Sequence, residues 1–439
     1  MTALEAMGAF VARGIRGRVP EKTRALAVLH VMDTVGAWIA GARASEGQAL
    51  LRAASAGGAG LDVATPCALA RLSEVDNIHL ASTTTPGGIV IPAALTIAAA
   101  RPGTDGTALL EAIVAGIEAM VRLGAAISGP TVLYRGIWPT YFAAPFGVAA
   151  VAARLHELDA EQAAHALALA LTFASPGVGH HSSATTSRWF AIGNDAQNGL
   201  IAAQAAQAGF TSDLNLLDGR FLHGVYGITP DLGAFADYHS GHFALDDTSF
   251  KPWCAARQTI SATQALREIM EAGVQPDAIT AIDVHVPPPY LAMIDHGVKS
   301  GDRASHLTSI SYRLALAAYD PPALFDVGHS PPAVPERIQA FMQKISVKAD
   351  EALLVYYPKA WPARITVRTA DTTQKRLVLH TPGDPQLPFD ERQVVAKFGR
   401  VVGSCDPQRA ERLLASGRTV FDGFDAATRL VSEIREAIA

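Results

Sequence analysis

The stretch TTTPGGIVIPAALTIAAA, residues 83–100, joins a turn of small residues to an apolar helix. Pro86, Gly87 and Gly88 leave room for close approach to the backbone, and we expect Pro92 to open the helix, because proline is tolerated in a first helical turn. A helix N-terminus presents backbone N–H groups and a positive dipole end, which favour an anion. The turn is therefore either the floor of an anion site or a tight corner in a packed helical core.

A second candidate is the histidine pair His180 and His181 in SPGVGHHSSATTSR, residues 175–188. Histidine suits proton transfer because its unperturbed pKa lies near neutrality. Glycines and serines on both sides predict a loop, and loops often carry functional residues, although most of their polar side chains are only solvated. The pair is either a proton-transfer group or part of a solvated loop.

Up to about residue 253 the sequence pattern predicts helices, and these must position the candidate residues. Leu109, Ile113 and Ile117 form an apolar stripe at helical spacing. Asp159, with Gln162 three residues later, predicts a capping box for the helix that follows.

Beyond residue 253 the apolar residues no longer recur only at helical spacing. Residues 279–286, ITAIDVHV, alternate apolar and polar side chains as a strand does, and residues 364–381 read as a β-hairpin. Between 253 and the first strand, Ser261 is expected to start a helix and Gly273 to end it. From DERQVVAKF, which begins at residue 390, helical patterns return.

This order predicts a mainly α fold with an α+β part. We expect a large all-helical domain over residues 1–253, completed by 388–439, and a smaller α+β lid domain over 254–387. A crevice between two such domains is a common place for a small-molecule site.

Composition narrows the function. The chain has 439 residues, 49% of them hydrophobic, and a net charge of −5 without a basic run, so we expect neither a nucleic acid nor a membrane as partner. Its three cysteines lie far apart, which argues against disulfides and a thiolate metal site. The N-terminus lacks the features of a signal peptide, and no stretch of eighteen apolar residues suggests a membrane span, so a cytoplasmic location is expected.

Several stretches, in matching order and spacing, resemble the MmgE/PrpD family, which includes 2-methylcitrate dehydratase, cis-aconitate decarboxylase and iminodisuccinate epimerase. The resemblance runs nearly end to end and is carried by MDTVGAWIAGA, EVDNIHLASTTTPGGIVIPAAL, GIWPTYFAAPFGVAAVAARL, RWFAIGNDAQNG, FKPWCAARQT, SISYRLALA and YPKAWPARITVRTADTTQKRLVLHTPGDPQLPFDERQVVAKF. It implies a homodimer without cofactor or metal, a helical domain with an α+β lid, and a small carboxylic acid as substrate.

The resemblance also implies a site whose histidines have changed. Glu74 and Asp76 match an acidic run of the family and His79 keeps a histidine position, whereas Thr85 and Trp138 stand where family members carry histidines. The turn of residues 86–88 would then be a ligand floor.

A third family histidine is replaced by Ile260, and a family lysine is matched by Arg188. Lys251, Arg257 and Tyr312 remain. The cations thus persist where three proton-transfer groups are absent, and an enlarged apolar wall implies a substrate with fewer carboxylates than citrate and a hydrophobic part.

Roles follow from these matches. Arg188, Lys251 and Arg257 are expected to bind the substrate carboxylate, in a substrate-binding set that also includes Glu74, Thr85 and Trp138. The catalytic set comprises Tyr312, His79, Asp76, His180 and His181, with the histidine pair replacing lost imidazoles.

Each role has a structural alternative. Arg188 and Lys251 would otherwise form interdomain ion pairs, and Tyr312 would be a buried tyrosine with a satisfied hydroxyl. His79 would orient a helix end and Asp76 would cap a helix.

The leading interpretation is a cofactor-independent lyase that removes water or a carboxyl group next to a carboxylate of a small carboxylic acid. An isomerase or epimerase that abstracts a proton is the second, and a noncatalytic carboxylate-binding homologue is the third.

We predict that 2-methylcitrate and cis-aconitate are not the physiological substrates. Thr85, Trp138 and Ile260 stand where those reactions use histidines, and loss of a proton-transfer group lowers a rate by about 100- to 10,000-fold. Assays of the purified protein with both acids test this, and turnover at ordinary enzymatic rates would contradict it.

Overall fold

The computed structural model describes residues 1–56, 62–174, 185–238, 241–403 and 405–438. The chain forms two compact units, which are described separately. Unit 1 combines Met1–Gly179, Thr186–Ser249 and Asp390–Ala439, and unit 2, among the described residues, combines Thr185 with Phe250–Phe389.

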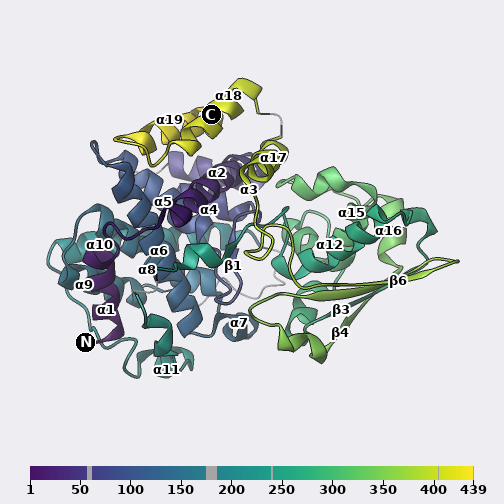
Figure 1. The fold of residues 1–439 in the computed structure, drawn as a ribbon, viewed down its shortest axis with the longest axis horizontal. Coiled ribbons are helices and arrows are strands. Elements are labelled where there is room, and N and C mark those ends of the chain that lie inside the picture. Colours follow the sequence, from purple (N-terminus) through teal and green to yellow (C-terminus); the bar gives the residue numbers. More distant parts are fainter. Residues whose placement is uncertain (57–61, 175–184, 239–240, 404, 439) are drawn as a thin grey trace. The chain divides into compact units, whose positions relative to one another are not determined.

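Unit 1 is almost entirely helical (Figure 1). Its helices are α1 (Ala3–Ala9), α2 (Glu21–Arg43), α3 (Ser45–Ser55), α4 (Ala64–Leu72), α5 (Gly87–Ala99), α6 (Gly106–Ala126), α7 (Gly129–Val132), α8 (Pro139–Leu155), α9 (Ala160–Thr172), α10 (Ser187–Gln207), α11 (Phe221–Tyr226), α17 (Glu391–Val402), α18 (Pro407–Arg418) and α19 (Ala426–Ile438). Two short strands, β1 (Ile78–His79) and β2 (Thr248–Ser249), pair antiparallel.

The core of unit 1 is formed by helices that are buried on every side. All residues of α8 are buried, and so are those of α5 up to Ala98. A helix that is apolar all round belongs in a protein core. Helix α8 packs against α5, α6, α9 and α10, so it is the centre of this unit.

Helix α2 is the one described helix that is long and apolar enough to cross a membrane, which the sequence analysis did not expect. In the most apolar window of α2, 78% of the residues are buried inside the structure. The helix packs against α4, α5 and α17 and carries buried polar residues, His30 and Asp33. These are the properties of a core helix.

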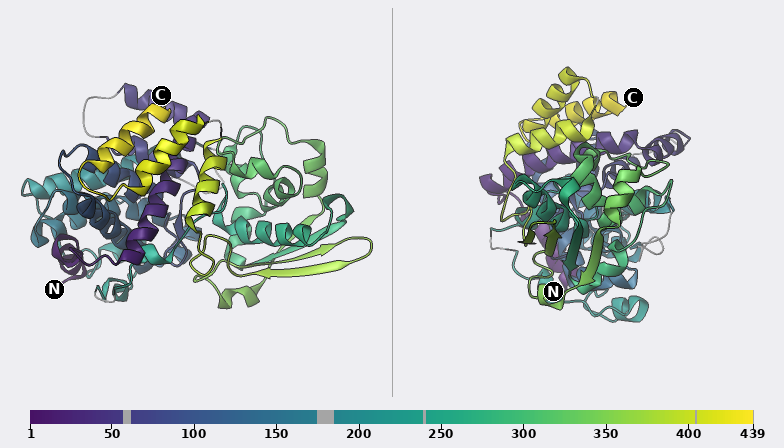
Figure 2. Two further views of the ribbon diagram at one scale, coloured as in Figure 1. Left: turned by 45° about the horizontal axis from the view of Figure 1, so that its top comes forward. Right: turned by 90° about the vertical axis from the view of Figure 1, so that its right-hand side faces the viewer.

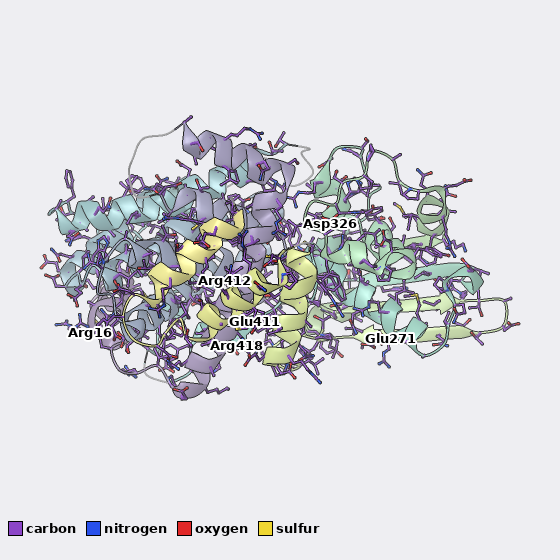
Figure 3. All side chains as sticks on the ribbon, turned by 90° about the horizontal axis from the view of Figure 1, so that it is seen from above. Arg16, Glu271, Asp326, Glu411, Arg412 and Arg418 are labelled. Atoms are coloured by element: carbon purple, nitrogen blue, oxygen red, sulfur yellow. The ribbon has the colours of Figure 1, made fainter. Side chains whose placement is uncertain are left out.

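The C-terminal segment completes unit 1. Figure 2 shows α18 and α19 side by side, and both pack on α2. Figure 3 labels Glu411 and Arg418 on α18. Arg418 forms ion pairs with Glu411 at 3.5 Å and with Glu391 of α17 at 2.6 Å.

Helix α17 is held by a buried ion pair. The Lys397 ammonium lies 2.6 Å from the Asp33 carboxylate of α2 and donates a 3.0 Å hydrogen bond to the carbonyl of Val75. Lys397 is 5% exposed and Asp33 is 3% exposed. Burial raises the pKa of the Asp33 carboxyl, and the nearby ammonium opposes that rise.

Unit 2 contains a four-stranded mixed sheet with the order β4-β3-β5-β6. Strand β3 (Ala281–Val286) pairs parallel with β4 (Ile345–Ala349) and antiparallel with β5 (Ala363–Arg368), which forms a hairpin with β6 (Thr373–Val378). Ile282, Val284 and Val286 are buried and alternate with half-buried residues, so one face of β3 is in the core.

Helices cover that sheet. They are α12 (Arg257–Glu271), α13 (Leu291–Ile294), α14 (Arg303–Thr308), α15 (Ile310–Tyr319) and α16 (Glu336–Met342). Helix α12 packs on β5 and β6 as well as on α15, which contacts α16, and Figure 1 shows these three helices on one side of the strands.

The predicted fold class, mainly α with an α+β part, is confirmed. The capping box of Asp159 and Gln162 is present, and Gly273, with φ of +110°, follows the end of α12. Two helix starts were wrong. Helix α5 begins at Gly87 with Pro92 inside it, because burial on all sides outweighs the about 3 kcal/mol that an interior proline costs. Helix α12 begins at Arg257, before Ser261.

We predict that Lys397→Met lowers the free energy of unfolding by about 3–5 kcal/mol, because it leaves the buried Asp33 carboxylate without a cation. Urea unfolding followed by circular dichroism measures this.

Two further variants are controls. Arg392→Met, at an exposed position of the same helix, should change the unfolding midpoint little. Replacing both partners, Lys397→Met with Asp33→Leu, should recover most of the loss. An unchanged midpoint for the single Lys397 variant would show that the ion pair does not stabilise unit 1.

Candidate functional site

The turn before α5 is filled by side chains of the same unit. The backbone N–H of Gly87 donates to Asn77 Oδ1 at 2.7 Å. A Cβ at Gly87 would lie 2.3 Å from the Asn77 amide, and one at Gly88 would lie 2.6 Å from Asp76 Oδ2. The glycines are therefore required for close packing of residues 76 and 77, and the first N–H of the helix already has an acceptor.

Asn77 is fixed in turn by His30 of α2. The Asn77 amide donates to His30 Nδ1 at 2.9 Å. Burial, followed by the charge of Lys397, lowers the pKa of His30 to about 3, so the ring stays neutral and accepts this bond. The turn is thus a tight corner of the helical core, fixed by buried polar contacts.

Next to this corner, Arg71 of α4 binds both predicted acidic residues. It lies 3.0 Å from Asp76 Oδ1 and 3.0 Å from Glu74 Oε1. Burial alone would lower the pKa of the Arg71 guanidinium, but the two carboxylates raise it above its ordinary value. Glu74 has a φ of 54°, so the loop takes an uncommon conformation that brings both carboxylates to one arginine.

Arg188 lies between aromatic rings at the start of α10. Its guanidinium carbon is 5.0 Å from the centre of the Trp138 ring and 5.6 Å from that of Trp189. Trp138 is the N-cap residue of α8 and also contacts Tyr141 edge to face, with ring centres 5.9 Å apart. The buried indole N–H of Trp138 has no acceptor among the described residues.

Tyr141 links these two groups. Burial raises the pKa of its phenol, and the charges of Arg71 and Arg188 oppose the rise while that of Glu74 adds to it. Arg71, Asp76, Trp138, Tyr141 and Arg188, which are buried, and Glu74, which is half-buried, therefore form one group of polar and aromatic side chains, which we call the unit-1 cluster.

Thr85 contacts Thr140, the residue that precedes Tyr141 of this cluster. Its backbone N–H donates to Thr140 Oγ1 at 3.1 Å, and the two hydroxyls are 3.2 Å apart. His79 is nearby in sequence, and its Nδ1 accepts the backbone N–H of Ser82 at 3.2 Å. Burial lowers the pKa of His79 to about 4, so this imidazole is neutral at pH 7.

Unit 2 contains a second group around Tyr312. The Tyr312 hydroxyl lies 2.7 Å from His329 Nε2. Burial raises the pKa of Tyr312 to about 12 and lowers that of His329. At neutral pH the phenol therefore keeps its proton and donates it in a hydrogen bond to the neutral imidazole.

The other nitrogen of His329 faces a carboxylate. His329 Nδ1 lies 3.8 Å from Oδ2 of Asp326, which Figure 3 labels. The ring of His306 contacts Tyr312 edge to face, with centres 5.0 Å apart, and burial lowers the pKa of His306 as well. We call Tyr312, His329 and His306 the unit-2 group.

The remaining predicted cations of unit 2 are Lys251 and Arg257, which are each 2% exposed. Arg257 lies 2.8 Å from Asp384 Oδ2 and also donates to Thr381 Oγ1 and Ser261 Oγ at 3.2 Å. Its guanidinium is thus engaged by an internal carboxylate, and its expected role in substrate binding stays a prediction.

Glu74, Asp76, Trp138 and Arg188 are thus brought together in unit 1, to which Thr85 and His79 also belong. Lys251, Arg257 and Tyr312 belong to unit 2. His180 and His181 lie outside the described residues.

Sequence reasoning missed Arg71, Tyr141 and His329. The first two lie only three residues from predicted site residues, Arg71 before Glu74 and Tyr141 after Trp138, so proximity in sequence was the available signal. For His329 the only signal is its place in VGHSPP, a loop pattern.

Two other features were considered as sites. Within the described ranges, no three His, Cys, Asp or Glu side chains are placed to hold a metal ion. A pocket of about 240 Å³ lies between α3, α4 and α10 and is lined in part by Asp62, Thr65, Phe190 and Asn194, but it contains none of the predicted site residues.

Comparison with known families gives two matches. The model of the MmgE/PrpD N-terminal domain matches residues 63–229, and the model of the MmgE/PrpD C-terminal domain matches residues 253–419. No curated protein matches the chain.

We predict that Arg257→Ala lowers the free energy of unfolding by about 3–5 kcal/mol, because it leaves Asp384 buried and unpaired. A matched control is Arg337→Ala, which breaks an exposed pair of equal length, 2.8 Å to Asp277, and should change unfolding little because water screens that pair. Equal unfolding midpoints for both variants would contradict a structural role for Arg257.

Proposed function

Because the chain belongs to the MmgE/PrpD family, we propose that it is an enzyme acting on a small carboxylic acid, and specifically a cofactor-independent lyase that removes water or carbon dioxide next to a carboxylate. The family is generally enzymatic, and its hydro-lyases support an enzyme that acts on a small carboxylic acid. We further propose that it acts as a homodimer in the cytoplasm.

The observation that carries the proposal is the 2.7 Å contact between the Tyr312 hydroxyl and His329 Nε2. These reactions build negative charge next to a carboxylate and need a positioned group that moves a proton. A phenol that donates to a neutral imidazole can take a proton from carbon while it passes its own proton to His329. Asp326, at 3.8 Å, would then favour the imidazolium that forms.

The carboxylate requires a cation, and Arg188 is the residue that we propose for it. It is 6% exposed and lies over two indole rings. Stacking uses the face of a guanidinium, whereas bidentate carboxylate binding uses its in-plane N–H groups, so one arginine can do both. The indole walls also suit a substrate with a hydrophobic part.

An epimerase or isomerase is the second candidate. The Tyr312–His329 pair favours it equally, because the phenol can take a proton from carbon as it passes its own to the neutral imidazole, and the reverse transfer returns a proton to carbon. A noncatalytic homologue would bind the acid without converting it.

A thermal-shift screen against small mono-, di- and tricarboxylates, followed by product analysis by NMR, separates these functions. Loss of water or carbon dioxide supports the lyase. Exchange of a carbon-bound proton with deuterated solvent, without elimination, supports the epimerase. Binding without either reaction supports the noncatalytic homologue and contradicts an enzyme.

We predict that Arg188→Ala weakens binding of the acid found in this screen by well over tenfold, because removing a buried charged partner costs about 2–5 kcal/mol. Isothermal titration calorimetry measures the affinity. Arg52→Ala, at an exposed position of unit 1, is the control and should bind as the parent does. Normal binding by Arg188→Ala would exclude the proposed role.

Tyr312→Phe should spare binding and lower turnover by about 100- to 10,000-fold, because the phenol acts in the transition state. Tyr319→Phe on the same helix removes a hydroxyl that donates to Asp277 at 2.8 Å and serves as the control. If Tyr312→Phe turns over at the parent rate, Tyr312 does not move the proton.

A further inference from the structure

Asp195 lies on the buried face of α10 that also carries Arg188. The two residues are seven positions apart, which places them on the same face of a helix, about 10 Å apart along its axis. Arg188 is 6% exposed and Asp195 is 4% exposed. A long arginine side chain and a small substrate can bridge that separation.

The Asp195 carboxyl has no evident structural task. Its Oδ2 atom is buried without a hydrogen-bond partner, and no cation forms an ion pair with it among the described residues. It lies in the interior of α10, where it cannot cap the helix. Buried carboxyls that serve a fold are paired or hydrogen-bonded, since desolvating one alone is costly.

Three helices, α4, α8 and α9, pack against α10, and their titratable groups are the candidates for a partner of Asp195. Helix α8 contributes Tyr141, and the charge of Asp195 adds to the rise that burial causes in the pKa of its phenol. Helix α4 contributes Arg71, which is paired with Glu74 and Asp76, and Cys67, whose thiol donates to the carbonyl of Ile89 at 3.2 Å.

The third helix, α9, has two titratable groups. Glu161 is exposed, and His165 accepts the backbone N–H of Ser212. A second ionisable residue of α8, Arg154, is bound to Glu111. None of these groups is paired with Asp195.

Close packing keeps this face of α10 dry. A Cβ at Gly199, one turn after Asp195, would lie 2.3 Å from the carbonyl oxygen of Pro145 on α8. As a consequence of such burial, the pKa of the Asp195 carboxyl rises to about 7 from an ordinary value of 3.8. The group can therefore hold or release a proton near neutral pH.

We propose that Asp195 is a second acid–base residue of the enzyme, and that it exchanges a proton with the acid bound at Arg188. This rests on the proposed function. In a dehydration, the proton of the Asp195 carboxyl passes to the substrate hydroxyl as the C–O bond breaks. The electron pair of the C–O bond stays with the oxygen, which leaves as water. The electrons of the broken C–H bond form the new double bond, and the proton taken from carbon is returned to solvent while Asp195 is reprotonated.

The test uses Asp195→Asn, which keeps the size of the side chain and cannot deliver a proton. Binding of the acid from the screen is measured by calorimetry at pH 7.5 in buffers of different ionisation enthalpy, together with kcat and kcat/KM between pH 5.5 and 9. Asp213→Asn, at an exposed position of the same unit, is the control.

A carboxylate bound close to Asp195 disfavours its charged form, so the parent protein should take up a proton on binding and Asp195→Asn should not. In the parent, kcat/KM should fall as pH rises above about 7, and kcat should fall at a higher pH because the bound acid raises the pKa of Asp195. In Asp195→Asn the fall at high pH should vanish, and kcat should be about 100- to 10,000-fold lower than in the parent. The affinity for the acid should change far less.

Thermal unfolding checks that the variant folds. Because the pKa of Asp195 is higher in the folded state than in the unfolded chain, the folded state binds more protons between about pH 4 and 7, and stability falls as pH rises through that range. Asp195→Asn lacks this fall, so it should melt no lower than the parent at pH 8.

The outcomes separate the two proposals. If the parent binds and converts an acid but Asp195→Asn shows the parent's kcat, pH profile and proton uptake, the assignment of Asp195 is overturned and the proposed function stands. If the parent binds no acid of the panel, the proposed function fails, and the role of Asp195 fails with it.

Discussion

The ion pair between Lys397 and Asp33 is the interaction on which the candidate site of unit 1 depends. The same ammonium binds the carbonyl of Val75, directly before Asp76 and Asn77. Asn77 then fixes the first turn of α5 against His30, and Asp76 fixes Arg71. One buried cation therefore joins the C-terminal segment to the loop that carries the acidic residues, in a core where an unpaired charge is costly.

Buried polar groups in this protein fall into two kinds. Those with internal partners, such as Arg257 with Asp384 or Arg71 with its two carboxylates, hold segments in place. Others have no partner among the described residues, such as the Trp138 indole N–H, Asp195 Oδ2 and the indole N–H groups of Trp253 and Trp361 in unit 2. Because desolvated polar groups are normally paired, each such atom is a candidate contact for a ligand, and Trp138 and Asp195 stand out because Trp138 contacts Arg188 and Asp195 shares α10 with it.

The sequence predicted what local patterns determine. The stripe on α6, the capping box of Asp159 and the alternation in β3 depend on residues a few positions apart. Pro92 and Ser261 misled because burial, and not a local start signal, sets where α5 and α12 begin. Partners far apart in sequence were missed, as with Lys397 and Asp33, because no local period links them. His329, seventeen residues from Tyr312, was missed for the same reason.

Unit 1 is interrupted in sequence by the whole of Phe250–Phe389, and this interruption sets an order of events during synthesis. Asp33 leaves the ribosome early, and its cation follows only after unit 2 has been made, roughly 20–70 seconds later at ordinary translation rates. During that interval the later helices that pack on α2 are absent, and a carboxylate destined for the core must stay hydrated or protonated. All strands of unit 2 have been made before then. The inserted unit is therefore free to fold before its host can close, which makes the nascent chain, more than the finished protein, the form that needs protection from aggregation.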